Sequence, residues 1–365
     1  MMKPLKFKKL AVILLLAVTY TALAAGAEAT RTFEKLFTLT GKASLEIENR
    51  YGSVDIRNWD KEEISVKVDV KVTHSSRETA DRQLSFINIS FSQQNNSVKA
   101  ITEIDQRIGR SGFRLFSSGS DEPGISINYT VYAPKESDLR ITHRYGDIFI
   151  NEATGHTFID LRYGNLQANS IIRDNTRPLS EINLAYSTKA NITEADWLQV
   201  NMRYSDLSVV NCRALVVSSS YSKLRVEKAS SIVTESRYGE YHLGDINNFV
   251  TESAYTNYSI GSISNTLDVE SRYGNVRVNK MPADFSKIKF TSSYGNMRIG
   301  IDPGASYRIE SSASYGNVNI PSVGSVNRIS SGRQSTISGV IGTEADPSAT
   351  VEITSRYGNV DLTAR

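Results

Sequence analysis

The stretch Ser271-Arg272-Tyr273-Gly274-Asn275-Val276 decides the fold of this 365-residue chain. It returns almost unchanged at Ser355–Val360, and Ser-Arg-Tyr-Gly stands at 236–239. From residue 145 on, its tyrosine recurs at steps of 17 to 23 residues, followed by one step of 42. A fixed period of about 20 residues is typical of a solenoid. The recurring tyrosines are Tyr145, Tyr163, Tyr186, Tyr204, Tyr221, Tyr238, Tyr255, Tyr273, Tyr294, Tyr315 and Tyr357.

The residues within one period predict a strand, a corner, a second short strand and a turn. Val269, Ser271 and Tyr273 alternate with charged residues, which is the period of a strand with one face inward. The alternation shifts phase at Gly274-Asn275, a pair that tolerates the left-handed backbone conformation of a corner. We therefore expect the tyrosines to stack in an internal ladder. Because the 42-residue step is twice 21, one copy is expected to have lost its tyrosine near Thr336.

These patterns predict an all-β chain, folded as a parallel β-helix or β-solenoid with rungs of about 17–21 residues and an N-terminal β-rich cap. We expect a signal peptide at 1–27, the cap at 28–135 and the repeats at 136–365. In the cap, strands are expected at 64–72, 87–91, 97–104 and 125–133, with a short helix from the capping box at 75–78 to about Phe86. The loop at 107–124 is either a mobile insertion or a binding loop with aromatic anchors.

The first 27 residues are typical of a signal peptide, which predicts export to the periplasm or the cell surface. A basic head precedes an apolar run at 10–18, and small residues suited to cleavage follow at 22–27. A retained N-terminal anchor is the alternative. Removing the four lysines of the head changes the balance from 42 − 39 = +3 to 38 − 39 = −1. The mature chain therefore lacks the basic charge expected of a nucleic-acid-binding protein.

No catalytic, cofactor or metal site is predicted. The single cysteine, Cys212, excludes an internal disulfide and a cysteine-based metal site. The four histidines show no ligand spacing and are expected at the surface or in turns. The alternative is a polysaccharide-active β-helix enzyme, which would gather acids from neighbouring rungs into a cleft. Its candidate carboxylates are Asp147, Asp160, Asp206, Glu240 and Asp268.

The arginines before the tyrosines are the candidate binding residues. Strand alternation points them outward, and stacked rungs could place several of them in one column. Such a stripe would bind acidic polysaccharide or lipid headgroups, whereas the alternative is a solvated face neutralised by salt bridges. The predicted surface stripe comprises Arg144, Arg162, Arg203, Arg237, Arg272 and Arg356.

The chain stops one short strand after the last motif, at Asp361–Arg365. This predicts an open strand edge at the C-terminal rung, through which copies could associate edge to edge. The alternative is that these residues fold over their own edge.

Three segments carry a family resemblance: Asn49–Val54 followed by Trp59-Asp60-Lys61, then Tyr129–Pro134, and then His143–Ile148. From about Thr38 to the end, the chain resembles the putative-adhesin family of β-strand-repeat proteins of bacterial envelopes. That resemblance implies an exported protein with a parallel β-helix-like fold and brings no catalytic residues. The leading hypothesis is a non-enzymatic scaffold or binding surface that contacts an envelope glycan or protein. An envelope-sensing partner of a membrane protein is a further alternative.

Overall fold

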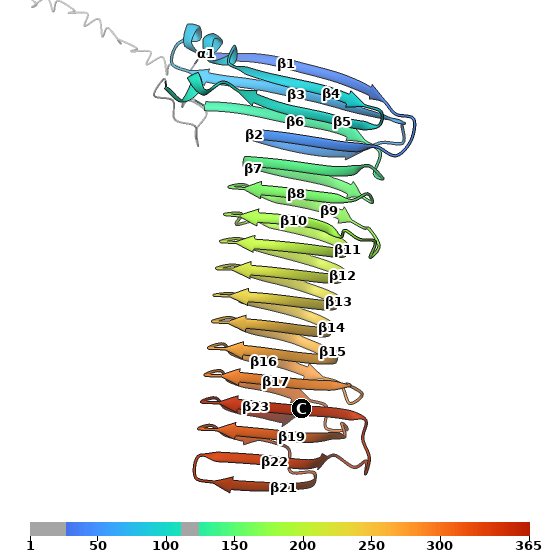
Figure 1. Ribbon diagram of the computed structural model, residues 1–365, viewed down its shortest axis with the longest axis vertical. Helices are drawn as coiled ribbons and strands as arrows, with labels where there is room; N and C mark the ends of the chain where they lie inside the picture. The colour runs from blue at the N-terminus through green and yellow to red at the C-terminus, as the bar shows by residue number, and fades with distance from the viewer. Residues whose placement is uncertain (1–26, 111–123) are drawn as a thin grey trace, which may run out of the picture.

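The computed structural model describes residues 27–110 and 124–365. The predicted signal peptide, apart from Ala27, and most of the predicted loop at 107–124 lie outside these residues. Within them the chain is all-β and solenoid-like, with a single α-helix at one end. Figure 1 shows the N-terminal strands gathered at one tip and the repeats stacked below them as a rod.

The repeats form two faces because each long strand bends near its middle. In β13 (Lys223–Arg237), residues 231–237 precede the tyrosine corner, and we call the stack of such segments face 1. Residues 223–229 follow the previous corner, and their stack is face 2. Both halves pair in parallel with the next strand, β14 (Glu240–Ala254), in a register offset by 17 residues, such as Ile232 with Phe249. Successive rungs thus place equivalent residues directly above one another.

The remaining rungs repeat this plan as long bent strands or as pairs of short ones. Their strands are β7 (Asp138–Ala153), β8 (Thr157–Arg162), β9 (Leu166–Ile171), β10 (Ser180–Ala185), β11 (Ala190–Arg203), β12 (Asp206–Ser220), β15 (Asn257–Arg272), β16 (Val276–Met281), β17 (Lys287–Ser293), β18 (Met297–Ile301), β19 (Tyr307–Ser314), β20 (Val318–Asn319), β23 (Ala349–Arg356) and β24 (Val360–Ala364).

The interior between the two faces is apolar but contains rows of hydroxyl groups. Ile232, Tyr241 and Phe249 are fully buried. Thr234 donates to the Thr251 hydroxyl one rung away at 2.7 Å, and the Tyr241 hydroxyl lies 2.8 Å from the Ser219 hydroxyl. These bonds satisfy side chains whose burial would otherwise be costly.

From Tyr163 on, the motif tyrosines form a ladder outside the core, so the prediction of an internal ladder was wrong, although Tyr51 at the cap end of the ladder is buried. Each has a φ between 50° and 65°, in the left-handed region, which interrupts the strand alternation and turns the side chain outward at the corner. From Tyr163 on, the side chains are 39–50 % exposed, and neighbouring rings stack with centroids 4.6–5.2 Å apart. In spatial order the ladder is Tyr51, Tyr145, Tyr163, Tyr186, Tyr204, Tyr221, Tyr238, Tyr255, Tyr273, Tyr294, Tyr357 and Tyr315.

The glycine and asparagine of the motif serve the stacking of rungs and not the left-handed turn predicted for them. A Cβ on Gly295 would lie 2.1 Å from the Gly274 carbonyl oxygen of the neighbouring rung, so close approach requires glycine there. The Asn275 side-chain oxygen accepts hydrogen bonds from the backbone and side-chain N–H groups of Asn296 at 3.2 and 3.1 Å. The corner is therefore fixed by a backbone contact and an amide ladder.

The N-terminal cap extends both faces with antiparallel strands. Its elements are β1 (Ala27–Thr38), β2 (Ser44–Asn58), β3 (Glu63–His74), α1 (Arg77–Leu84), β4 (Ile87–Gln94), β5 (Ser97–Ile104), a 3-10 turn (Gln106–Arg110) and β6 (Gly124–Ala133). The predicted cap strands and the helix are confirmed, and the Ser76 side chain accepts from the Thr79 N–H as N-cap. β2 pairs in parallel with β7, so the cap and the rungs share one ladder.

The C-terminal rung lies inside the stack and not at its edge. β23 pairs with β17 on one side and β19 on the other, and β24 lies between β18 and β20. The prediction that this rung is the exposed end of the stack is therefore wrong, while self-association through it stays a prediction. Figure 1 shows the C-terminus within the rod, with β21 (Gly324–Ser331) and β22 (Gln334–Ile341) at the tip.

The predicted tyrosine-free copy near Thr336 is also wrong. Thr336 lies in β22, which pairs antiparallel with both β19 and β21. The long step in the tyrosine spacing therefore holds a terminal hairpin instead of a degenerate rung.

Candidate functional site

The predicted arginines form one column on the outer side of face 1, next to the tyrosine ladder. Each occupies the position before a tyrosine, and backbone pairing places these positions in register. Arg50 belongs to the same column but was missed, although it precedes Tyr51 in the same motif. In spatial order the arginine column reads Arg50, Arg144, Arg162, Ala185, Arg203, Ser220, Arg237, Ala254, Arg272, Ser293, Arg356 and Ser314.

From Arg162 on, arginine and a small residue alternate strictly along this column. Rungs are about 4.8 Å apart, so the alternation separates successive arginines by about 9.6 Å. Ala185 and Ser220 lie on either side of Arg203. The small residues keep like charges from stacking in adjacent rungs and leave room between the guanidinium groups.

The arginines differ in their partners. Arg162 Nε lies 3.3 Å from Asp160 in an exposed ion pair, and such a pair contributes little stability. The Arg203 guanidinium lies 5.5 Å from the centre of the Tyr204 ring and forms no ion pair within the described residues. Arg356 makes the same contact with Tyr357 at 5.4 Å. The predicted salt-bridged face is therefore present at Arg162 and absent at Arg203.

A row of glutamates lies beside the column in its middle part. Glu235, Glu252 and Glu270 stand in register on three adjacent rungs, and all three are exposed. They line a shallow groove of about 620 Å³ together with Arg237 and Arg272. We call these three residues the acidic row. It makes this part of face 1 unfavourable for an anion.

A second groove on the same face has a different character. It has a volume of about 510 Å³ and is lined by Arg162, Arg203 and Arg237. The neighbouring outward column holds Asp160 and Glu235 at its two ends and the neutral polar residues Asn183, Asn201 and Ser218 between them. The Asn201 side-chain amide donates to the Asn183 side chain at 2.8 Å. We call this the arginine groove. It combines positive charge with amide and hydroxyl groups.

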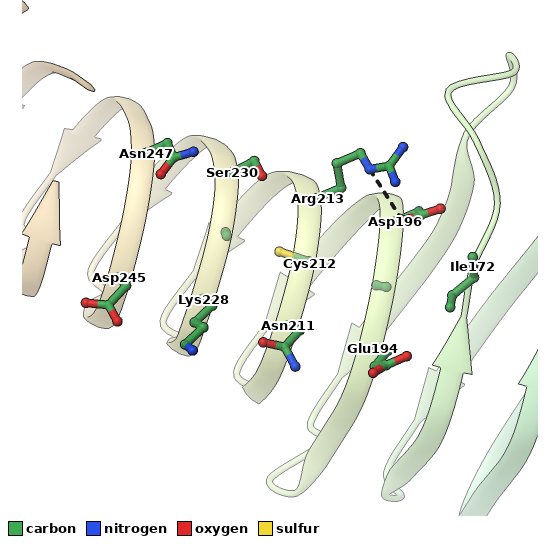
Figure 2. A pocket seen from close by; sticks show the side chains of 12 residues that line it. Ile172, Glu194, Asp196, Asn211, Cys212, Arg213, Lys228, Ser230, Asp245 and Asn247 are labelled. Carbon is green, nitrogen blue, oxygen red and sulfur yellow. Dashed lines mark ion pairs between the residues drawn. The ribbon is translucent and has the colours of Figure 1, made fainter. Parts of the chain in front are cut away.

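A third groove, of about 580 Å³, follows the bends of the strands away from the ladder. Figure 2 shows Glu194, Asn211, Lys228 and Asp245 in one row across four successive rungs, so two acids, an amide and a lysine share this row. Its Cys212 thiol has a pKa raised to about 12 by burial. The thiol is therefore protonated at neutral pH and poorly suited to act as a nucleophile.

The carboxylates considered for a glycan-active enzyme are spread over both faces. Asp206 and Glu240 share one column of face 2, with Lys223 on the rung between them. Asp160 pairs with Arg162 on face 1, whereas Glu240 pairs with Lys223 on face 2. Asp147 accepts hydrogen bonds from the Asn165 backbone and side chain. The acids that do converge are those of the acidic row, which that hypothesis did not name. Their common signal was glutamate three positions before a tyrosine in consecutive repeats.

Residues 27–110 and 124–365 contain neither a metal-binding cluster nor a membrane-spanning helix. No group of three or more His, Cys, Asp and Glu side chains there is placed to hold a metal ion. No helix there has the length and apolar character needed to cross a bilayer. His143 was expected at the surface but is fully buried, because its strand position faces the interior.

Stacked rungs with continuous side-chain columns define a repeat protein that presents one extended surface. A family model described as Toastrack DUF4097 matches residues 42–363, so the chain belongs to this family. The resemblance to the putative-adhesin domains of unknown function is thereby confirmed. The comparison with curated proteins found no match.

Among solved structures, the chain is similar to a putative cell adhesion protein from Clostridium sporogenes, at 10% identity and a TM-score of 0.22 over 92% of this chain and 100% of the other. It is also similar to a putative lipid binding protein from Parabacteroides distasonis, at 9% identity and a TM-score of 0.34 over 93% and 98%. A putative adhesin from the same organism matches at 9% identity and a TM-score of 0.32 over 93% and 98%.

Proposed function

We propose that this chain is an exported, non-enzymatic scaffold of the cell envelope that binds extended, negatively charged polymers along face 1. One observation carries the proposal. The arginine column runs beside the tyrosine ladder along the rod, the ladder is exposed from Tyr163 on, and the acidic row faces the column on only three rungs. A single-file row of cations on a rigid support favours a long anionic chain over a compact ligand.

Two further features support the scaffold. Successive rungs pair in parallel at an offset of 17 residues in β12, β13 and β14, and from this we infer a parallel β-helix. The N-terminal basic and apolar segments favour export. The scattered, locally paired carboxylates outside the acidic row favour a role without catalysis.

Binding to immobilised acidic glycans tests the proposal. The mature protein should be retained on hyaluronan and polygalacturonate beads, should pass through neutral dextran, and should elute as salt is raised because the attraction is electrostatic. Replacing all six predicted arginines by glutamine should abolish retention. Replacing Arg225, Arg277 and Arg298 on face 2 by glutamine should leave retention unchanged.

Two outcomes would count against the proposal. Passage of the wild-type protein through both acidic resins would remove the binding role. Release of new reducing ends from either glycan during incubation would instead favour the polysaccharide-active enzyme.

Fractionation of cells that express the full chain tests export. We expect the protein to be recovered with the periplasm or the outer surface.

A further inference from the structure

The arginine groove and the acidic row divide face 1 into unequal parts, and the groove has the features of a glycan subsite. Its charged residues are Arg162, Arg203 and Arg237, together with Asp160 and Glu235. Between the arginines lie Asn183, Asn201 and Ser218, whose amide and hydroxyl groups suit sugar hydroxyls.

We propose that the arginine groove binds a linear glycan that carries a carboxylate on every second sugar, laid parallel to the rod axis. The inference rests on the proposed function and specifies the ligand class of the same face. Its basis is the two-rung period of Arg162, Arg203 and Arg237. Two rungs span about 9.6 Å, which is close to the length of one disaccharide in an extended β-linked chain.

Arg203 is the central contact of this site. Its guanidinium touches the Tyr204 ring and has no carboxylate partner within the described residues, so its N–H groups are available. Arginine binds a carboxylate through two parallel hydrogen bonds. Ala185 and Ser220, one rung to either side, leave space for the uncharged sugar of each disaccharide.

The neighbouring residues set the length of the ligand. Glu235 begins the acidic row, and Glu252 follows one rung further on. A glycan carboxylate placed beyond Arg237 would face this row and be repelled. The footprint therefore covers the three arginines of the groove, which corresponds to three carboxylates and hence to a hexasaccharide of three disaccharides.

The geometry disfavours nucleic acid and membrane as occupants. Bases bind single-strand proteins by stacking on aromatic faces, but the faces of Tyr186 and Tyr204 are covered by neighbouring rings of the ladder. A membrane surface is two-dimensional, whereas these cations stand in single file. The tyrosine hydroxyls at the exposed edge of the ladder instead suit a hydrogen-bonding polymer.

Titration calorimetry of the folded protein with defined oligosaccharides tests this inference. The probes are hyaluronan hexasaccharide, with carboxylates on alternate sugars, and hexagalacturonate, with a carboxylate on each sugar. We expect at least tenfold tighter binding of the hyaluronan hexasaccharide by the wild-type protein. Arg203→Gln should weaken that binding tenfold or more, and Arg225→Gln, an exposed arginine on face 2, should not change it.

A gain-of-charge variant tests the period itself. Ser220→Arg places a cation between Arg203 and Arg237, so it should favour hexagalacturonate and reverse the preference. Circular dichroism melting of each variant confirms that the rod is intact.

Vesicles with anionic lipid headgroups are the third ligand tested. We expect no vesicle binding that Arg203→Gln weakens.

The outcomes separate the two proposals. Equal affinity for both hexasaccharides, or an unchanged affinity in Arg203→Gln, overturns the alternate-carboxylate site while general binding to acidic polymers stands. Binding to vesicles that Arg203→Gln removes assigns the groove to lipid headgroups instead. If no acidic glycan binds to any part of the folded protein, the proposed function and this inference fail together.

Discussion

Tyr294 stacks on Tyr357, with ring centroids 4.8 Å apart and planes inclined by 7°, although Tyr315 lies between them in the sequence. Tyr315 stacks on the other side of Tyr357, at 4.6 Å. The last motif of the chain is thus inserted between two earlier ones. The spatial order of the repeats differs from their order in the sequence at this point.

Ending the chain after Asp346 should therefore open the distal part of the rod. The truncation removes β23 and β24, so β17, β18 and β19 each lose the partner on one side and keep β15, β16 and β22 on the other, while β20 loses its pairing with β24. Hydrogen exchange should show lost protection in these strands, while β11 to β14 keep theirs. Arg365→Ala, which retains both strands, is the control. Full protection of β19 in the truncated chain would contradict this order of rungs.

Tyr241→Ala should destabilise the protein more than Tyr238→Ala, although the two tyrosines share one rung. Tyr241 is fully buried, whereas Tyr238 is 47 % exposed. Truncating a large buried aromatic costs about 3–5 kcal/mol. Tyr238→Ala removes two stacking contacts worth about 0.5–1.5 kcal/mol each. Chemical denaturation of both variants compares their unfolding free energies, and equal losses would contradict the outward ladder.

Tyr238→Gly should be more stable than Tyr238→Ala. Tyr238 has a φ of 56°, and the left-handed conformation costs a residue with a Cβ about 1–2 kcal/mol. Glycine avoids this cost while losing the same ring contacts. The same denaturation experiment measures the difference. A less stable glycine variant would show that the backbone at this corner is not strained.

Gly295→Ala should disturb the spacing of the rungs. The added Cβ would meet the Gly274 carbonyl oxygen at 2.1 Å, and overpacking of this kind costs about 1–3 kcal/mol or more. The melting temperature should fall accordingly. Gly332→Ala is the control, since a Cβ there meets nothing within 4 Å although its φ is 59°. Gly295 has no positive φ, so equal effects would show that the close approach to Gly274 costs no more than the backbone strain of an alanine at Gly332.

Stability should fall as the pH drops through the range below about 6.5 because of His143. Burial lowers the pKa of His143 below its usual 6.5, although hydrogen bonding to Gly52 and Asn49 and the nearby Asp147 act in the opposite direction. The unfolded chain then binds a proton that the folded chain rejects, which favours unfolding in acid. Melting temperatures measured between pH 7 and pH 5 should fall less in His143→Gln than in the wild type. Equal falls in melting temperature in His143→Gln and the wild type would exclude His143 as the cause.

The sequence predicted the rung plan and the outward arginines because both follow from strand alternation, as in Val269 and Arg272. It failed for the tyrosines because alternation does not report a left-handed φ. In the sequence pattern, Tyr273 continues the inward phase of Val269 and Ser271. In the structure, its φ of 58° directs the side chain outward. Ring stacking between rungs compensates for that conformation, and a pattern within one repeat does not reveal it.

The candidate site was predictable as a set of arginines but not as a periodic array. The period depends on which repeats are neighbours in the stack. The spacing role of Ala185 and Ser220 is visible only once both are known to lie next to Arg203. The insertion of the Tyr357 rung between those of Tyr294 and Tyr315 was likewise not predictable. Repeats that match the motif equally well give no signal for the order in which they stack. The terminal hairpin at β21 and β22 gave no signal beyond a missing tyrosine.

The inserted rung has a consequence for biosynthesis. A ribosome releases the segments of β17 to β20 before β23 and β24, which must lie between them, so the distal rod cannot be completed until those two strands have been made. A product terminated before β23 would leave strands of the distal rod without these partners and more open to proteolysis.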